Sequence, residues 1–257
     1  MEADATPKTQ PPHLGECPPG ELNNNVPTGS AVRICLISDT HGALPHTWPE
    51  ADILIHCGDL GCQYDREQQH ELLRALAKAG DYRLRVLVPG NHDHEATPEN
   101  CPEGLKILID QELSFEGLRI YGSPATFRRG SGAFERHPEQ MRATWSKIPP
   151  QTDVLITHTP PRGLLDAWQR PNGINEHIGC PYLHIYLQHL NLSLMGCGHV
   201  HASRGVLRGL PKQPQTLLVN ASLHGPGRRE KLFYAPYVVT LRKTTSGWHA
   251  ESAEEAC

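Results

Sequence analysis

Apolar residues along this chain gather in short runs that are separated by more polar loops. The first run, VRICLIS, is rich in β-branched residues and almost continuously apolar, which is typical of a strand covered on both faces. The same pattern recurs along the chain. We expect strands over 32–38, 52–56, 84–88, 106–109, 118–121, 154–157, 192–195, 216–219 and 237–241.

Helical periodicity is rarer than strand-like patterning. It predicts helices over 66–79, 138–146 and 181–190. In the first of these, Leu72, Leu73 and Leu76 share one face. The stretch ELSFEGLRIYG indicates a hairpin that turns at Glu116-Gly117. Many strands and few helices favour two stacked sheets with the helices outside them.

The chain is predicted to hold one domain with a tail at each end. Its 257 residues suffice for one large α/β domain with a substantial core, which we expect over 31–245. Residues 1–30 are rich in Pro, Asn, Gly and Glu without apolar periodicity, which predicts a disordered tail. Residues 246–257 end in ESAEEAC and are predicted to be a frayed, acidic C-terminal tail.

Five of the apolar runs end in residues that can bind a metal ion. In chain order these ends carry Asp39-x-His41, Gly58-Asp59, Gly90-Asn91-His92-Asp93, His158 and Gly198-His199-x-His201. Residues two apart in extended chain point to the same side, and a glycine lets the backbone approach a small charged centre. Loops at the carboxyl ends of strands meet in one crevice of an open α/β sheet, so these five ends can share one site.

Charge and cysteine content narrow the classes of function. The formal net charge is −4 and there is no dense Lys/Arg tract, which disfavours a nucleic-acid or membrane-surface binder. No apolar stretch approaches the ~20 residues of a membrane helix, and no secretory signal is present. The eight cysteines include no C-x-x-C pair, so we expect reduced thiols. These features predict a soluble cytoplasmic protein, with the nucleus as the alternative.

The ordered motifs resemble those of the calcineurin-like metallophosphoesterase superfamily over roughly 33–241. The stretches YGSPATF, HTPPRGLLD and VNAS are similar, more narrowly, to its small eukaryotic metallophosphoesterase domain-containing branch. The resemblance implies an α/β fold, a four-layer α/β/β/α sandwich of two mixed sheets flanked by helices. It also implies hydrolysis of phosphoesters by a hydroxide held between two metal ions.

The same resemblance assigns the site residues. It gives one metal ion to Asp39, His41, Asp59 and His201, and the other to Asp59, Asn91, His158 and His199. Asp59 would bridge the two ions, and Asn91 and His92 would contact the substrate, with His92 as the catalytic residue that assists the leaving group. Oxygen and nitrogen donors without a thiolate suit two divalent or trivalent ions of Mn, Fe or Zn, and the sequence does not choose among these metals.

One departure from relatives bears on the substrate. Ser/Thr protein phosphatases place arginines in the motifs that here read GDLGCQ and VPGNHD, and without that clamp a phosphomonoester dianion is held less well. The sequence therefore favours a phosphodiesterase, with cyclic nucleotides among its candidate substrates. The alternatives are a phosphomonoesterase or protein phosphatase, and a metal-loaded scaffold that binds a nucleotide with little turnover. The expected partner is a small-molecule phosphoester or nucleotide, and the sequence identifies no protein partner.

Overall fold

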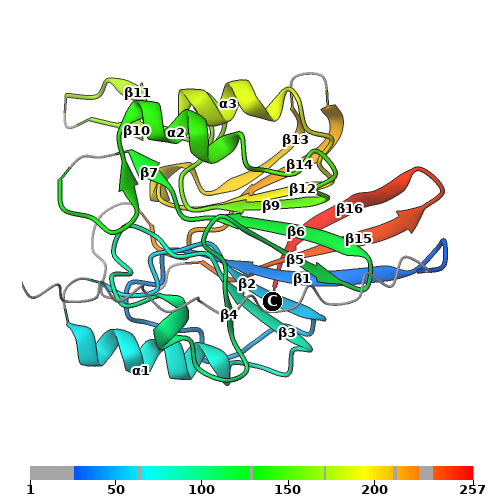
Figure 1. Ribbon diagram of the computed structural model, residues 1–257, viewed down its shortest axis with the longest axis horizontal. Helices are drawn as coiled ribbons and strands as arrows, with labels where there is room; N and C mark the ends of the chain where they lie inside the picture. Colours follow the sequence, from blue (N-terminus) through cyan, green and yellow to red (C-terminus); the bar gives the residue numbers. More distant parts are fainter. Residues whose placement is uncertain are drawn as a thin grey trace, which may run out of the picture.

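Two six-stranded sheets packed face to face form the centre of the protein (Figure 1). The computed structural model describes residues 26–62, 65–127, 130–170, 172–210, 213–225 and 234–256. Short elements lie between the main strands, namely η1 (Pro98–Asn100), β7 (Thr126–Phe127), β8 (Glu135–Arg136), β10 (Ala167–Gln169), β11 (Asn175–His177) and η2 (His201–Ser203).

Sheet one has the strand order β16-β15-β1-β2-β3-β4. Its strands are β1 (Ala31–Ile37), β2 (Ile53–His56), β3 (Leu84–Leu87), β4 (Lys106–Ile107), β15 (Tyr237–Thr244) and β16 (Gly247–Glu255). Strands β1 to β4 are parallel neighbours, whereas β15 runs antiparallel to β1 and to β16. The carboxyl ends of β1, β2 and β3 therefore meet at one edge of this sheet.

Sheet two has the strand order β13-β14-β12-β9-β6-β5. Its strands are β5 (Gln111–Phe115), β6 (Leu118–Ser123), β9 (Val154–Thr157), β12 (Leu194–Cys197), β13 (Gly205–Leu210) and β14 (Gln213–Asn220). Strands β14, β12, β9 and β6 are parallel, and β13 and β5 are antiparallel additions at the two edges. The predicted hairpin at Glu116-Gly117 is confirmed, because β5 and β6 pair on either side of it.

A helix covers the outer face of sheet one. Helix α1 (Arg66–Ala77) contributes Leu73 and Leu76 to a buried cluster that also contains Leu54 and Leu87 of the sheet. The leucines lie on one face of the helix, as their spacing predicted. The helix ends two residues before the predicted end at 79.

On the far side of the molecule, helices α2 (Pro138–Trp145) and α3 (Pro181–Leu187) lie over sheet two (Figure 1). Their Trp145 and Leu183 side chains are buried in one cluster with Met195 of β12. No helix within the described ranges combines the length and apolar character needed to cross a membrane.

The space between the two sheets is filled by a third apolar cluster. Ile34 and Leu36 of β1 belong to this inner cluster, whereas Cys35 and Ile37 belong to the cluster under α1. Successive side chains of a strand point to opposite faces, and here both faces meet an apolar layer, which explains the continuous apolar run at 32–38. The four-layer α/β/β/α sandwich expected from the sequence is confirmed.

Within the segment 246–257, predicted to be a frayed tail, residues Gly247–Glu255 form β16, which pairs with β15. Trp248 is 3% exposed and its Nε1 donates to the carbonyl oxygen of Gly117, while Ala250 is 5% exposed. These two side chains, two positions apart in the strand, pack in the inter-sheet core, whereas Glu251, Glu254 and Glu255 are exposed. The prediction was wrong because the acidic composition of 251–255 hid the two buried positions that precede it.

The N-terminal boundary of the domain also differs from the predicted one. Residues 1–25 of the predicted tail lie outside the described residues. Within the rest of it, the Gly29 amide donates to the carbonyl oxygen of Lys243 at 2.8 Å, and the Lys243 amide donates to Ser30 at 2.8 Å. The chain is thus attached to sheet one before the predicted start of the domain at 31.

Trp248→Ala is expected to lower the free energy of unfolding by about 3 kcal/mol, because it removes a large side chain from the inter-sheet core. Denaturant unfolding followed by circular dichroism measures this change. Glu254→Ala, at an exposed position of the same strand, is the control and should cost less than about 0.5 kcal/mol. Equal small effects of the two substitutions would show that β16 does not belong to the core.

Candidate metal centre

The predicted ligands lie at the edge where the carboxyl ends of strands from both sheets meet. Ser38, directly after β1, forms a β-bridge with Ser222, shortly after β14, and the Leu223 amide donates to the Ser38 carbonyl oxygen at 2.9 Å. This bridge joins sheet one to sheet two at that edge. Side chains that follow strands of either sheet can therefore face one common crevice.

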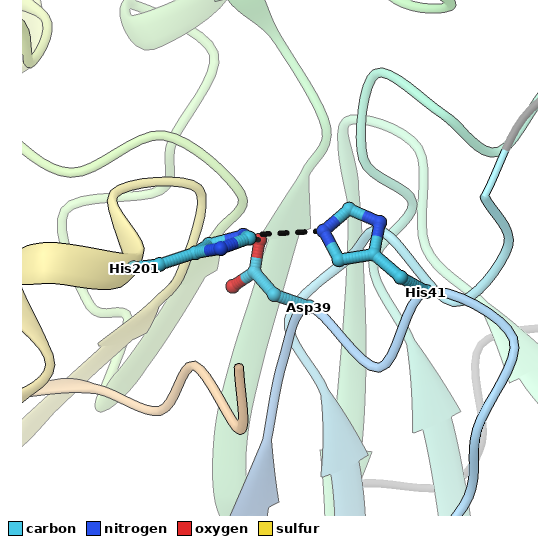
Figure 2. Close-up of side chains that lie close together, drawn as sticks. All are labelled: Asp39, His41 and His201. Atoms are coloured by element: carbon cyan, nitrogen blue, oxygen red, sulfur yellow. Dashed lines mark hydrogen bonds and ion pairs between the residues drawn. The ribbon is translucent and has the colours of Figure 1, made fainter. Parts of the chain in front are cut away.

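Asp39, His41 and His201 form the first group of potential ligands (Figure 2). Nε2 of His41 lies 3.1 Å from Nε2 of His201, and Nε2 of His201 lies 3.2 Å from Oδ1 of Asp39. Asp39 is fully buried and His41 is 4% exposed. Asp39 and His41 follow β1, and His201 is the first residue of η2. The structure therefore brings His41 together with a residue 160 positions later in the sequence.

Asp59, Asn91, His158 and His199 form the second group. Nε2 of His158 lies 3.2 Å from Oδ1 of Asn91, 3.2 Å from Nδ1 of His199 and 3.3 Å from Oδ2 of Asp59. The other ring nitrogen of His158, Nδ1, donates to the carbonyl oxygen of Cys57 at 2.9 Å. In the neutral ring that hydrogen bond fixes the tautomer, so that Nε2 has a lone pair available to a cation.

The spacing of these atoms fits a bound cation. Donors that each lie about 2.0–2.2 Å from one transition-metal ion are separated from one another by about 3.0–3.5 Å. The distances of 3.1 to 3.3 Å in the two groups fall in this range. Asp59 lies between the groups, because its carboxylate is within 4.8 Å of ligand atoms of His41 and His92 and of those of His158 and His199. The structure brings all seven predicted ligands together, and their ligation of metal stays a prediction.

Neighbouring histidines keep the carboxylates of Asp39 and Asp59 ionised. Burial opposes their ionisation, but His201 beside Asp39 and His158 beside Asp59 hold both carboxyl pKa values well below the usual range. Burial also disfavours a charged His158, yet the charges of Asp59 and Asp39, with the hydrogen bonds to Asp59 and Cys57, together outweigh it and raise the pKa of His158 to about 9. The centre thus favours positive charge. A bound cation would replace the His158 proton, because only the neutral imidazole can ligate.

Four of the predicted ligands have an unusual backbone conformation. Asp39, His41, Asp59 and His199 have φ of 53°, 44°, 56° and 68°, and they are half of the eight non-glycine residues with positive φ in the described ranges. This region costs a side-chain-bearing residue on the order of 1 kcal/mol or more. Hydrogen bonds hold it in place, since the Asp39 amide donates to Gly58 at 2.8 Å and the His199 amide donates to the Asp39 carboxylate at 3.0 Å.

The glycines before the ligands are required by close contacts, as the sequence predicted. A Cβ on Gly198 would lie 1.9 Å from Oγ of Ser38 and 2.3 Å from Oδ2 of Asp39. A Cβ on Gly90 would lie 2.3 Å from Oδ1 of Asp59. Any side chain at these two positions would displace a predicted ligand.

His92, the predicted catalytic residue, lies beside Asp59 and His41. Its amide donates to Oδ1 of Asp59 at 2.9 Å, and its Nε2 is 3.9 Å from Oδ2 of the same carboxylate. The side chain is 20% exposed, whereas that of His158 is fully buried. His92 can therefore reach both the carboxylate and a molecule that approaches from solvent.

Two buried residues support the ligand loops without having been assigned a role from the sequence. The Asp93 carboxylate accepts from the amides of Gly90, Gly61 and Leu60 at 2.8, 2.9 and 3.2 Å, which ties the loop after β3 to the loop after β2. His224 is fully buried, and its Nε2 donates to the carbonyl oxygen of Thr40 at 3.2 Å. Like the predicted ligands, His224 follows a strand of the parallel set, so the same strand-end rule could have identified it.

His56, which flanks the motif of Asp59, links two ligand loops. Its Nδ1 accepts from the Gly58 amide at 3.1 Å, so its Nε2 carries the proton and donates to Oγ1 of Thr40 at 2.9 Å. Thr40 donates in turn to the carbonyl oxygen of Leu60 at 3.2 Å. Burial lowers the pKa of His56 to about 3, so the ring stays neutral and keeps this hydrogen-bond order.

Comparisons with known proteins agree with this geometry. The family model described as calcineurin-like phosphoesterase matches residues 32–203. A UPF0046 protein of Caenorhabditis elegans is 29% identical over 242 residues, which are 84% of this chain and 80% of that protein. The human metallophosphoesterase domain-containing protein 1 is 29% identical over 248 residues, which cover 83% of this chain and 72% of that protein.

A solved structure shares the fold. Phosphopantetheinyl hydrolase from Mycobacterium tuberculosis superimposes with a TM-score of 0.52 at 16% identity, over 87% of this chain and 97% of that chain. At this identity the likeness supports the arrangement of the sheets and helices only.

Asp59→Asn is expected to lose more metal than Asp39→Asn. Asp59 lies between the two groups, so neutralising it weakens both, whereas Asp39 belongs to the first group alone. Elemental analysis of the purified variants, with circular dichroism as the check on folding, measures the metal content per chain. Two metals per chain in folded Asp59→Asn protein would show that this carboxylate does not hold both ions.

Proposed function

Because the chain belongs to the calcineurin-like phosphoesterase family, we propose that it is a phosphoester hydrolase whose centre holds two metal ions with Asp59 between them. The observation that supports this most is the position of Asp59, whose carboxylate is within reach of both groups of potential ligands. One carboxylate has two oxygens and can bind two ions at about 3.5–4 Å separation.

The proposed ligand sets are those that the motifs assigned. Asp39, His41, Asp59 and His201 hold one ion, and Asp59, Asn91, His158 and His199 hold the other. When bound, two such ions supply Lewis-acid activation of water and neutralise charge on the phosphoryl oxygens. The oxygen and nitrogen donors suit Mn, Fe or Zn.

The chain's own residues orient the substrate and move the proton. Asn91 is half-buried and its Oδ1 lies 3.2 Å from Nε2 of His158, so its side chain can contact a metal ion or a phosphoryl oxygen bound there. His92 is beside Asp59 but partly open to solvent. A protonated His92 can therefore donate from its ring to the oxygen that leaves phosphorus, which is general acid catalysis.

We favour phosphodiesters over phosphomonoesters as substrates. The motifs around Asp59 and Asn91 read GDLGCQ and VPGNHD and contain no arginine that could clamp a phosphate. A monoester dianion carries one more negative charge than a diester and needs such a clamp more. Cyclic nucleotides are among the candidate diesters, and a small-molecule phosphoester or nucleotide is the proposed partner. A phosphomonoesterase is the second candidate.

We also propose a reducing compartment, the cytosol or the nucleus. The six cysteines that the structure describes are all free thiols, and four of them, Cys35, Cys57, Cys180 and Cys197, have no exposed surface. Burial raises the pKa of each of these thiols, which keeps them protonated and unreactive. They serve as small core residues and need no oxidising environment.

A matched pair of substrates tests the reaction. Purified protein with a measured metal content is expected to hydrolyse bis(4-nitrophenyl) phosphate and cyclic nucleotides faster than 4-nitrophenyl phosphate. Asp59→Asn serves as the control for contaminating hydrolases. Faster cleavage of the monoester would favour the second candidate, and stoichiometric metal without cleavage of either substrate would contradict the proposal.

His92→Ala separates proton transfer from metal binding. The variant should keep near-normal metal content, whereas His158→Ala should lose metal, because His158 has a ring nitrogen within 3.3 Å of three other potential ligands. The rate loss is expected to reach about 10²–10⁴ for alkyl diesters and to shrink for nitrophenyl esters, whose leaving groups need no proton. An equal loss across a series of leaving-group pKa values, with chemistry rate-limiting, would exclude this role.

A further inference from the structure

Gln69, in the first turns of α1, is a buried glutamine whose side chain binds the turn that carries His92. It is 3% exposed. Its Nε2 donates to the carbonyl oxygen of His92 at 3.1 Å, and its Oε1 accepts from the amide of Glu95 at 2.9 Å. A single amide group therefore holds both ends of the His92–Glu95 turn.

Water cannot take the place of this amide in the native packing. The gap bounded by Leu60, Gly61, Gln69, Leu73, Asp93 and Ala96 has no room for a water molecule. A Cβ on Gly61 would lie 3.0 Å from Cγ of Gln69, which shows how closely the side chain is enclosed. Removing its polar atoms would take the acceptor from the Glu95 amide and would leave the His92 carbonyl oxygen with the longer hydrogen bond from the His94 amide at 3.3 Å.

Helix α1, which carries Gln69, is held firmly on sheet one. Asp65 caps α1 by accepting from the Gln68 amide at 3.0 Å, and Leu72, Leu73 and Leu76 fix the helix on sheet one. A side chain in the first turns of α1 therefore has a fixed position relative to the sheet. Gln69 transmits that position to the backbone of the turn.

His92 is held from two sides of its backbone. On the strand side, its amide donates to Oδ1 of Asp59 and the neighbouring Asp93 carboxylate accepts from Gly90. On the helix side, its carbonyl oxygen accepts from Gln69. With both peptide groups fixed, rotation about the side-chain bonds is the freedom left to the imidazole.

We propose that Gln69 is a positioning residue that fixes the His92–Glu95 turn on α1 and thereby aims the His92 imidazole at the leaving group. The aim of the imidazole rests on the proposed function, whereas the anchoring of the turn does not. A displacement of a catalytic group by about 1 Å can cost on the order of 10² in rate, so a loosened turn has a measurable consequence.

Gln69→Met tests the inference, because methionine keeps the length of the side chain and removes both hydrogen bonds. Gln213→Met is the matched control. Gln213 is 6% exposed, its Nε2 donates to Leu187 and its Oε1 accepts from the Leu192 amide at 3.0 Å, so it is also a buried amide that bridges two backbone groups. It lies in sheet two, away from the His92 turn. Circular dichroism and elemental analysis establish folding and metal content for both variants.

Hydrogen exchange followed by mass spectrometry should show faster amide exchange over 92–96 in Gln69→Met and no change there in Gln213→Met. The rate on an alkyl diester should fall about tenfold in Gln69→Met, with a smaller loss on a nitrophenyl diester. In the His92→Ala background, Gln69→Met should cause no further loss, because both substitutions act on one group.

Unchanged exchange over 92–96, or losses that multiply in the double variant, would overturn the inference. If Gln69→Met does not fold, Gln69→Glu replaces it, since glutamate keeps the acceptor for Glu95 and lacks the donor to His92, and the same exchange result is expected. If the metal-loaded wild-type protein cleaves no phosphoester, the proposed function fails, and faster exchange in Gln69→Met still supports the anchoring of the turn.

Discussion

The structure depends on the attraction between two buried carboxylates and the positive charge that must lie between them. Asp39 and Asp59 are almost fully removed from water, and each raises the energy of the other because like charges repel. Histidines from distant parts of the chain supply the opposing charge, and a metal cation would supply more of it. Without such compensation, burial of both carboxylates would cost several kcal/mol per ion.

The rest of the fold holds these charges in place. Neither sheet contains the centre alone, since Asp39, Asp59 and Asn91 follow strands of sheet one and His158 and His199 follow strands of sheet two. The sheets join at this edge through the bridge between residues 38 and 222. The left-handed backbone of several ligands is unfavourable in itself, and the apolar layers on both faces of each sheet provide the stability that such a strained edge requires.

Much of this arrangement was predictable because buried parallel strands have a plain sequence signature. Continuous apolar runs located the strands, and the polar residues that end those runs located the centre. The sign of φ at Asp39 leaves no trace in composition, and β16 was missed because the glutamates that follow Trp248 and Ala250 dominated the pattern of this segment. Gln69 was missed for another reason. From sequence alone, a glutamine on a helix is predicted to be exposed to solvent, because the sequence does not show which loop packs against it.

The position of β1 has a consequence for how the protein is made. This strand pairs with β2 on one side and with β15 on the other, so residues near 240 complete the surroundings of a strand that begins at Ala31. At about 5–20 residues per second, a ribosome needs on the order of 10–40 s to make the chain between them. During that interval one edge of β1 has no neighbour and His201 is still to be added or only newly exposed. An unpaired strand edge can pair with another chain, so this interval is one in which the growing chain is exposed to aggregation.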